Sequence, residues 1–91
     1  YLGSAGKDHE GHHIVEQCQI RKSGFDAKMI HNTKNIISVP RDIHVKISAY
    51  YSSIDRSLCP SMRVRDYLAT MSFAEQYEFG LKILRDFGVI Q

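Results

Sequence analysis

The stretch Asn35-Ile36-Ile37-Ser38-Val39-Pro40 carries the clearest strand signal in this chain of 91 residues. Its β-branched residues favour extended backbone, and a proline stops the strand. Directly after it, apolar residues such as Ile43 and Ile47 recur at helical spacing, which predicts a helix from Arg41 to about Ser53. A strand that runs straight into a helix is therefore the centre of the predicted fold.

A partner for this strand lies upstream. The short apolar run His12-His13-Ile14-Val15 predicts a second strand. Between the two strands we expect an irregular segment with Gly24, a short helical stretch around Phe25–Ile30 and a polar turn at Asn32-Thr33-Lys34. Two strands alone do not hold a fold together, so helices downstream must build the core.

Two more helices are predicted in the C-terminal third. Pro60 allows a helix to start that contains Met62, Tyr67 and Leu68. Ser72-Phe73-Ala74-Glu75 is a capping box that opens the last helix. The sequence thus predicts an α+β fold, in which a short two-stranded hairpin and a helix are followed by two additional C-terminal helices.

The apolar residues and glycines of the last predicted helix indicate its buried face, its end and its packing. Its predicted buried face consists of Phe73, Tyr77, Leu81 and Leu84. Gly88 stands where a glycine C-cap belongs. Gly80 lies in the helix interior, where glycine costs about 1 kcal/mol relative to alanine, and this predicts close packing around it.

Length and composition limit the class of protein. With 91 residues and 43% hydrophobic content, the chain has room for one small globular domain. No apolar run approaches the roughly 20 residues of a membrane span, so we expect no membrane partner. Residues 1–10 are small and polar and lack a starting Met, so we expect a linker from the end of a longer parent protein, with the domain at 11–91.

The two cysteines, Cys18 and Cys59, are too few for a zinc site of four thiolates. They form either one disulfide or two reduced thiols. Their spacing shows no disulfide framework, which favours the reduced form.

The net charge of +2 hides an uneven distribution. Residues 17–65 carry +6, whereas residues 1–16 and 66–91 each carry −2. A basic segment is either a solvated face or the footprint of a phosphate-rich partner. Charge alone leaves both open.

Five histidines are present, and their placement is informative. His12 and His13 are adjacent in the first predicted strand, and His44 lies one turn into the helix after the second. Metal-assisted phosphodiester hydrolysis needs a divalent ion near the leaving oxygen and a general base near an attacking water. Neighbouring strand residues point to opposite sides, so a His-His pair can serve both needs. By itself such a dipeptide is more often two surface histidines.

The combination of Gly11-His12-His13-Ile14-Val15, Asn35-Ile36-Ile37 and His44 nine residues after Asn35 resembles the HNH/endonuclease VII nucleases, also called His-Me finger or ββα-metal nucleases. The Gly-His-His form, with stretches such as Ile47–Ser52 and Glu75–Leu81, is similar to C-terminal toxin domains of bacterial polymorphic toxins, including the Rhs type. The resemblance covers about residues 11–91 and implies a small ββα-metal core.

The resemblance also implies roles for individual residues. His12 would be a metal ligand and His13 the general base. Asn35 would brace the loop between the strands and help to orient His13. His44 would be the second metal ligand. Some HNH toxins carry another ligand four residues after this histidine, where the present chain has Ser48, a poor ligand.

A site with two imidazoles and several waters suits Mg²⁺ or Mn²⁺ supplied with the substrate, although imidazoles favour Zn²⁺ or Ni²⁺ in raw affinity. We expect Mg²⁺ to support activity and leave the metal open. His9 and His31 are expected on the surface, and either is a spare ligand in place of Ser48.

Basic residues near the motif fit phosphate binding. Arg41 lies at the helix start and Lys46 two residues beyond His44. The nucleic-acid backbone would be followed further out by Lys22, Lys34, Arg63 and Arg65. No motif indicates readout of bases, so we expect little sequence specificity and a strong salt dependence.

The resulting hypothesis is a metal-dependent, non-specific DNA endonuclease that acts as an antibacterial toxin. An RNase on the same scaffold is the nearest alternative, and a non-catalytic metal- or nucleic-acid-binding module is another. The toxin reading implies delivery as the C-terminal part of a larger protein into the cytoplasm of a target bacterial cell. It also implies a cognate immunity protein, expected to be acidic because the nuclease is basic.

Overall fold

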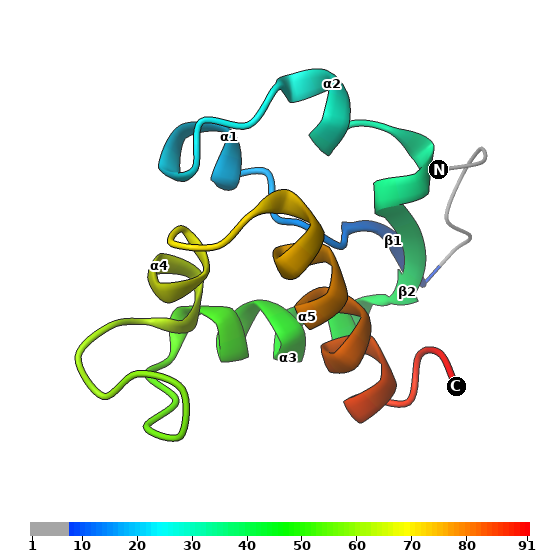
Figure 1. Ribbon diagram of the computed structural model, residues 1–91. Coiled ribbons are helices and arrows are strands. Elements are labelled where there is room, and N and C mark those ends of the chain that lie inside the picture. Colours follow the sequence, from blue (N-terminus) through cyan, green and yellow to red (C-terminus); the bar gives the residue numbers. More distant parts are fainter. Residues whose placement is uncertain (1–7) are drawn as a thin grey trace.

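The computed structural model describes residues 8–91 of the chain and shows a mixed α+β fold with one two-stranded antiparallel sheet (Figure 1). Strand β1 spans His9–His13 and pairs with β2, which spans Ile36–Pro40. In this register His9 is opposite Pro40 and His13 is opposite Ile36. The upstream strand therefore starts three residues before the predicted run at 12–15.

Most of the predicted linker, residues 1–7, lies outside the described residues. Its last two residues, His9 and Glu10, belong to β1.

Three short helical turns lie between the strands. They are α1 at Gln19–Lys22, α2 at Ala27–Ile30 and the 3₁₀ turn η1 at Thr33–Asn35. The side chain of Asp26 accepts a hydrogen bond from the Lys28 N–H at the start of α2. The helical stretch expected around Phe25–Ile30 is thus confirmed, whereas α1 has no counterpart in the prediction.

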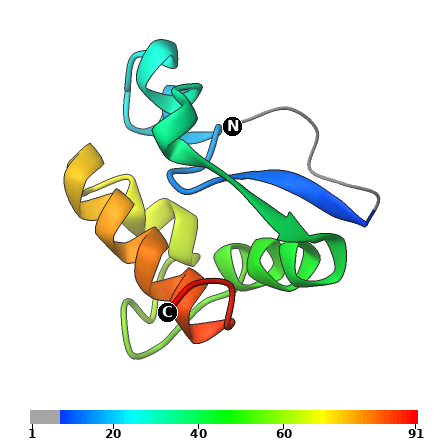
Figure 2. The ribbon, with the colours of Figure 1, turned by 90° about the vertical axis from the view of Figure 1, so that its right-hand side faces the viewer.

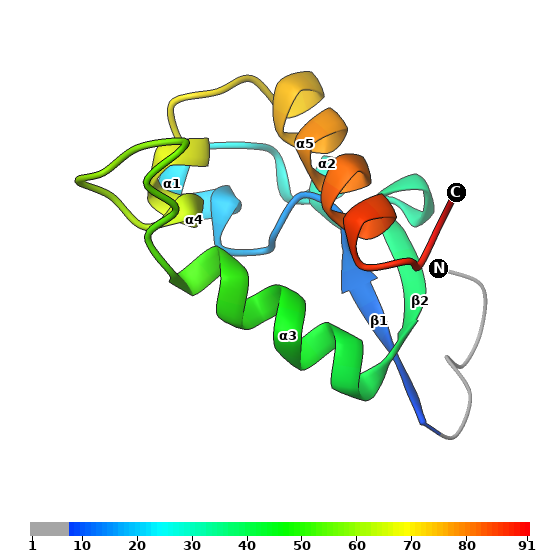
Figure 3. The same ribbon diagram turned by 90° about the horizontal axis from the view of Figure 1, so that it is seen from below.

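Helix α3 follows β2 without a gap and spans Arg41–Ser52, as predicted to within one residue. It contacts both strands and runs alongside them (Figure 3). Glu10 and His12 are two positions apart on β1 and so share one face of the strand. Glu10 and His12 each contact His44 of α3, which shows that this face of the strand is turned toward the helix.

The C-terminal part forms α4 at Val64–Leu68 and α5 at Phe73–Asp86. The prediction of a helix starting at Pro60 is wrong, because Pro60 and Met62 lie in the loop before α4. Both hydrogen bonds of the predicted capping box at the start of α5 are present. Gly88 follows the end of this helix with φ +75°, a backbone conformation that favours glycine.

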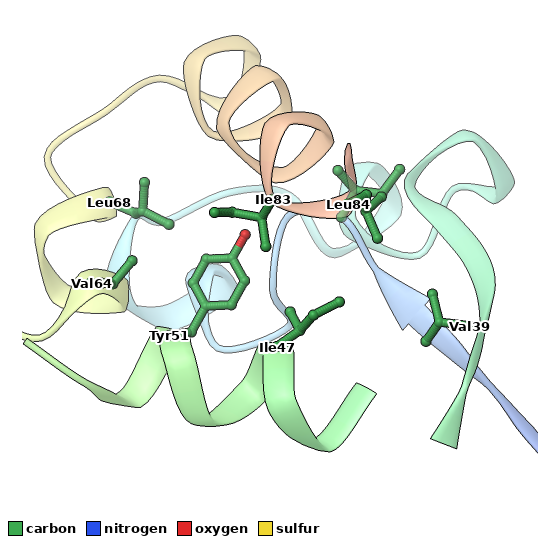
Figure 4. Packing of buried hydrophobic residues seen from close by; sticks show 8 residues of the cluster. Val39, Ile47, Tyr51, Val64, Leu68, Ile83 and Leu84 are labelled. Atoms are coloured by element: carbon green, nitrogen blue, oxygen red, sulfur yellow. The ribbon is translucent and has the colours of Figure 1, made fainter. Parts of the chain in front are cut away.

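The core lies where α3, α4 and α5 meet the strand pair (Figure 4). In Figure 2 the strand pair lies above α3, and α5 runs beside α3. The buried core residues are Ile14, Val39, Ile47, Tyr51, Val64, Leu68, Ile83 and Leu84. They come from the residue after β1 and from β2, α3, α4 and α5, so the core fixes the end of β1 and α3 relative to each other.

Helix α5 packs closely on the residue that follows β1. A Cβ on Gly80 would stand 2.6 Å from the Ile14 carbonyl oxygen and 2.7 Å from its Cγ2. The close packing predicted at this glycine is confirmed. The predicted buried face is only partly right, because α5 buries Gln76, Gly80, Ile83 and Leu84.

Cys18 and Cys59 are both free thiols, as favoured from the sequence. Within residues 8–91, no helix has the length and apolar character that crossing a bilayer requires.

Candidate functional site

A pocket of about 330 Å³ opens between the end of β1 and the middle of α3. Four residues predicted for the site line it: His12, His13, His44 and Ser48. The remaining lining residues are Gly11, Glu16, Gln17, Cys18, Ile47, Tyr51 and Arg65. The fold therefore gathers the predicted histidines, which are up to 32 positions apart in the sequence, around one cavity.

His12 is buried and carries a nitrogen with no partner. Its side chain is 4% exposed, and its Nε2 atom has no hydrogen-bond partner among the described residues. The ring stands edge-on to His44, with centroids 5.4 Å apart. Burial, with repulsion from His44 and His13, lowers the pKa of His12 to about 4. The imidazole is therefore neutral at pH 7 and has a lone pair to offer.

His44 is oriented by a carboxylate that the sequence analysis did not single out. Its Nδ1 atom lies 2.9 Å from Oε2 of Glu10, whose Oε1 lies 3.2 Å from Nε of Arg41. With its proton on Nδ1, His44 donates to this carboxylate and keeps a lone pair on Nε2. The signal that points to Glu10 is the strand alternation, since Glu10 precedes His12 by two residues.

The side chain of His13 extends from the side of β1 opposite to that of His12, and it contacts two polar groups. Its Nε2 atom lies 3.3 Å from Nδ1 of His31, and its Nδ1 atom lies 3.3 Å from Nε2 of Gln17. Burial is the main cause that lowers the pKa of His13, and repulsion from His31 adds to it. His31 is exposed, as expected, and it stands beside His13; it does not line the pocket with His44.

Asn35 is buried outside the pocket and ties three backbone segments together. Its Oδ1 accepts from the Val15 N–H at 2.8 Å. Its Nδ2 donates to the carbonyls of Val15 at 3.0 Å and Ile30 at 2.8 Å. Its own carbonyl accepts from the Ile14 N–H at 2.7 Å. Asn35 thus holds the residues that follow His13, and this is bracing of the kind expected.

An ion pair between Arg65 and Glu16 stabilises the far wall of the pocket. Arg65 was expected to contact the nucleic-acid backbone, and its pairing with Glu16 was not predicted. Arg65 donates from Nε and Nη2 to the two carboxylate oxygens of Glu16, at 3.2 and 2.8 Å. Its Nη1 donates to Ser52 at 2.8 Å, and its carbonyl accepts from the Gln19 side chain. Since protein groups take up most of its donors, Arg65 mainly joins the segment after β1 to α3 and α4.

Of the six predicted phosphate-binding residues, Arg65 alone lines the pocket, where it pairs with Glu16. Arg41 pairs with Glu10, whose other carboxylate oxygen contacts His44, and Lys46 lies exposed on α3. Lys22 is 2.6 Å from Asp66, whose pKa is lowered to about 2 by Arg63 and Lys22. Lys34 lines a second, smaller cavity beside Phe73 and Tyr77.

The pocket offers two imidazole ligands for a metal ion. The unpartnered Nε2 of His12 and the carboxylate-oriented ring of His44 fit such a role. Among residues 8–91, no group of three or more His, Cys, Asp or Glu side chains is arranged to hold an ion. Further ligands would be water, substrate oxygens or the hydroxyl of Ser48, which lines the same pocket.

No family model, curated protein or solved structure shows a significant match to this chain. The chemistry of the pocket is therefore the main guide to function.

Proposed function

We propose that this chain is a metal-dependent endonuclease that hydrolyses phosphodiester bonds in DNA without sequence specificity. The observation that carries the proposal is the convergence of His12, His13 and His44 on one pocket, with the buried Nε2 of His12 left without a partner. A buried polar atom without a partner is costly unless something binds to it. A cation shared with His44 would supply that partner.

Under this proposal, His12 and His44 hold the ion, and the ion supplies positive charge for the oxygen that leaves phosphorus. Glu10 orients His44 through its contact with Nδ1, which leaves Nε2 available to the ion. The strand pair and α3 would then form the ββα-metal core implied by the resemblance. The two imidazoles favour Zn²⁺ or Ni²⁺ in raw affinity. The open positions leave room for water and substrate oxygens, so Mg²⁺ or Mn²⁺ that arrives with DNA would be held mainly by those oxygens.

His13 is the general base of the proposal. It leaves the other side of β1 from His12, so it can take a proton from a water that attacks phosphorus opposite the leaving oxygen. Its lowered pKa keeps the imidazole neutral and able to accept that proton near pH 7. Asn35 acts as a positioning residue through the backbone after His13.

The charge pattern supports a nucleic-acid substrate. Arg41 is exposed at the start of α3, where it pairs with Glu10, and Lys46 is exposed on the same helix. Contacts of this kind neutralise phosphates and carry no sequence information. We further propose that the domain is a toxin delivered into the cytoplasm of target bacteria, and that an acidic immunity protein protects the producing cell.

Nicking of a supercoiled plasmid tests the proposal. Wild type, His13→Ala and the matched control His9→Ala, which removes an exposed histidine from the same strand, are compared with Mg²⁺, Mn²⁺, Zn²⁺, Ni²⁺ or EDTA. We expect metal-dependent cleavage by wild type and His9→Ala and none by His13→Ala. Cleavage only in a parallel RNA lane would make the chain an RNase. No cleavage of either substrate by folded protein would refute catalysis.

A further inference from the structure

His13 and His31 bring a second pair of imidazoles into contact. Their ring centroids are 5.3 Å apart and their planes meet at 84°. The contact joins the last residue of β1 to the residue that follows α2. His31 is exposed, so an ion in solution can reach the pair.

The distance between the two facing nitrogens fits one edge of a tetrahedral metal site. Nε2 of His13 and Nδ1 of His31 lie 3.3 Å apart. An ion with bonds of about 2.0–2.1 Å to both nitrogens would hold them at an angle of about 105–110°. This is close to the tetrahedral angle, whereas an octahedral ion requires about 90° and a shorter separation.

We propose that His13 and His31 form a second metal site, which binds Zn²⁺ through these two nitrogens, with water completing the shell. Imidazole is a preferred ligand of zinc and a poor one for Mg²⁺, so the site discriminates between the two ions. It uses other nitrogens than the His12–His44 pair. His13 and His12 leave opposite faces of β1, and His31 does not line the pocket that His13 shares with His12 and His44.

His13 and His31 can both adopt the tautomer that binds a metal ion without either ring giving up a proton. One ring donates an N–H to the other across the 3.3 Å contact, and this proton must move when an ion takes its place. If the shared proton is on His31, it passes to Nε2 of that ring, and Nε2 of His13 already has a lone pair. If it is on His13, it passes to Nδ1, where the Gln17 amide, turned to present its oxygen, accepts a hydrogen bond from it. Both rings remain neutral, and two lone pairs face the ion.

Zinc at this site would occupy the imidazole that acts as general base. Zn²⁺ should therefore inhibit cleavage supported by Mg²⁺. This consequence rests on the proposed function, whereas the binding of zinc does not.

Calorimetric titration with Zn²⁺ tests the second site. The full chain is first stripped of metal with EDTA and dialysed. Wild type is compared with His31→Asn, His31→Gln and the matched control His9→Asn. We expect both His31 variants to bind one zinc ion fewer per chain than wild type and His9→Asn. Visible absorption of Co²⁺ bound to wild type should show tetrahedral coordination, and the His31 variants should lose that signal.

Unchanged zinc binding by both folded His31 variants would overturn the proposal. Loss of one and the same ion in His31→Asn and His44→Asn would also overturn it, because it would mean a single shared site. In plasmid nicking with fixed Mg²⁺, the zinc concentration for half inhibition should rise at least about tenfold in His31→Asn. If wild type cleaves nothing, the proposed function fails, and the zinc count still decides the second site.

Discussion

Nδ1 of His44 lies 2.9 Å from Oε2 of Glu10, so a carboxylate on β1 decides which nitrogen of the α3 histidine faces the pocket. Removing such a partner lowers metal affinity by about 10–100-fold. We therefore expect Glu10→Ala to weaken Mn²⁺ or Zn²⁺ binding at the His12–His44 pair by this factor, measured by calorimetry. Asp42→Ala, an exposed acidic position in the first turn of α3, is the control. An equal loss there would mean a general charge effect.

His13→Ala should abolish cleavage and leave the fold intact. A general base contributes about 10²–10⁴-fold to rate, so we expect a loss of that size in the initial rate of plasmid nicking. His13 is only half-buried and its hydrogen bonds lie near the surface, so the thermal unfolding midpoint should change little. A variant that unfolds instead would show that His13 is structural.

Asn35→Ala should destabilise the fold. The substitution leaves the N–H and carbonyl of Val15 and the carbonyl of Ile30 without their buried partner. We expect a loss of about 2–4 kcal/mol in the free energy of unfolding, measured with urea. Asn32→Ala removes only an exposed cap bond to Lys34 and should cost about 1 kcal/mol. Where Asn35→Ala is folded, its cleavage rate should fall less than that of His13→Ala.

Acid should destabilise the metal-free protein through His12. Its pKa is about 4 in the folded chain, against 6.5 for an ordinary histidine. Since the unfolded chain binds the proton more readily, stability is present above pH 6.5 and is lost as pH falls toward 4. We expect a loss of about 2 kcal/mol between pH 7 and pH 5 in urea unfolding with EDTA. His12→Gln should remove this part of the slope and His9→Gln should keep it. Equal slopes in the two variants would contradict the assignment.

Gly80→Ala should disturb the contact between α5 and Ile14. Alanine favours a helix by about 1 kcal/mol over glycine. Its Cβ would nevertheless stand 2.6 Å from a backbone oxygen that cannot rotate away. We expect a net destabilisation of about 1–3 kcal/mol by thermal unfolding. Glu78→Ala, at an exposed position of the same helix, should change stability little. A more stable Gly80→Ala would show that the strand end shifts freely.

The parts of the fold that local chemistry determines could be predicted from the sequence. The strand ending at Pro40, the helix after it and the capping box before Phe73 all follow from nearest-neighbour preferences. The buried face of α5 could not be predicted in full, because two of its buried residues are Gln76 and Gly80. Gln76 is buried through hydrogen bonds to Ser23 and to the Met71 carbonyl, which only the tertiary structure reveals.

The candidate site divides in the same way. The positions of His12, His13 and His44 around one pocket were predicted from spacing and resemblance. The contact of Glu10 with His44 was not predicted, and His31 was expected only as a spare ligand in place of Ser48, not beside His13. Each contact joins segments far apart in the chain. Strand alternation would have indicated Glu10. For His31, no local pattern places the turn after α2 beside the end of β1.

The long segment between β1 and β2 affects when the pocket can form during folding. His12 and His44 meet only after residues 14–35 have closed into a loop and the strands have paired. Closing a loop of this length lowers the conformational entropy of the chain before the contacts between the strands can compensate for it. We therefore expect the pocket to form late in folding, together with the core. If the proposed delivery into a target cell passes the chain through a channel in unfolded form, the chain would carry no assembled site on the way, and any activity would begin only after refolding.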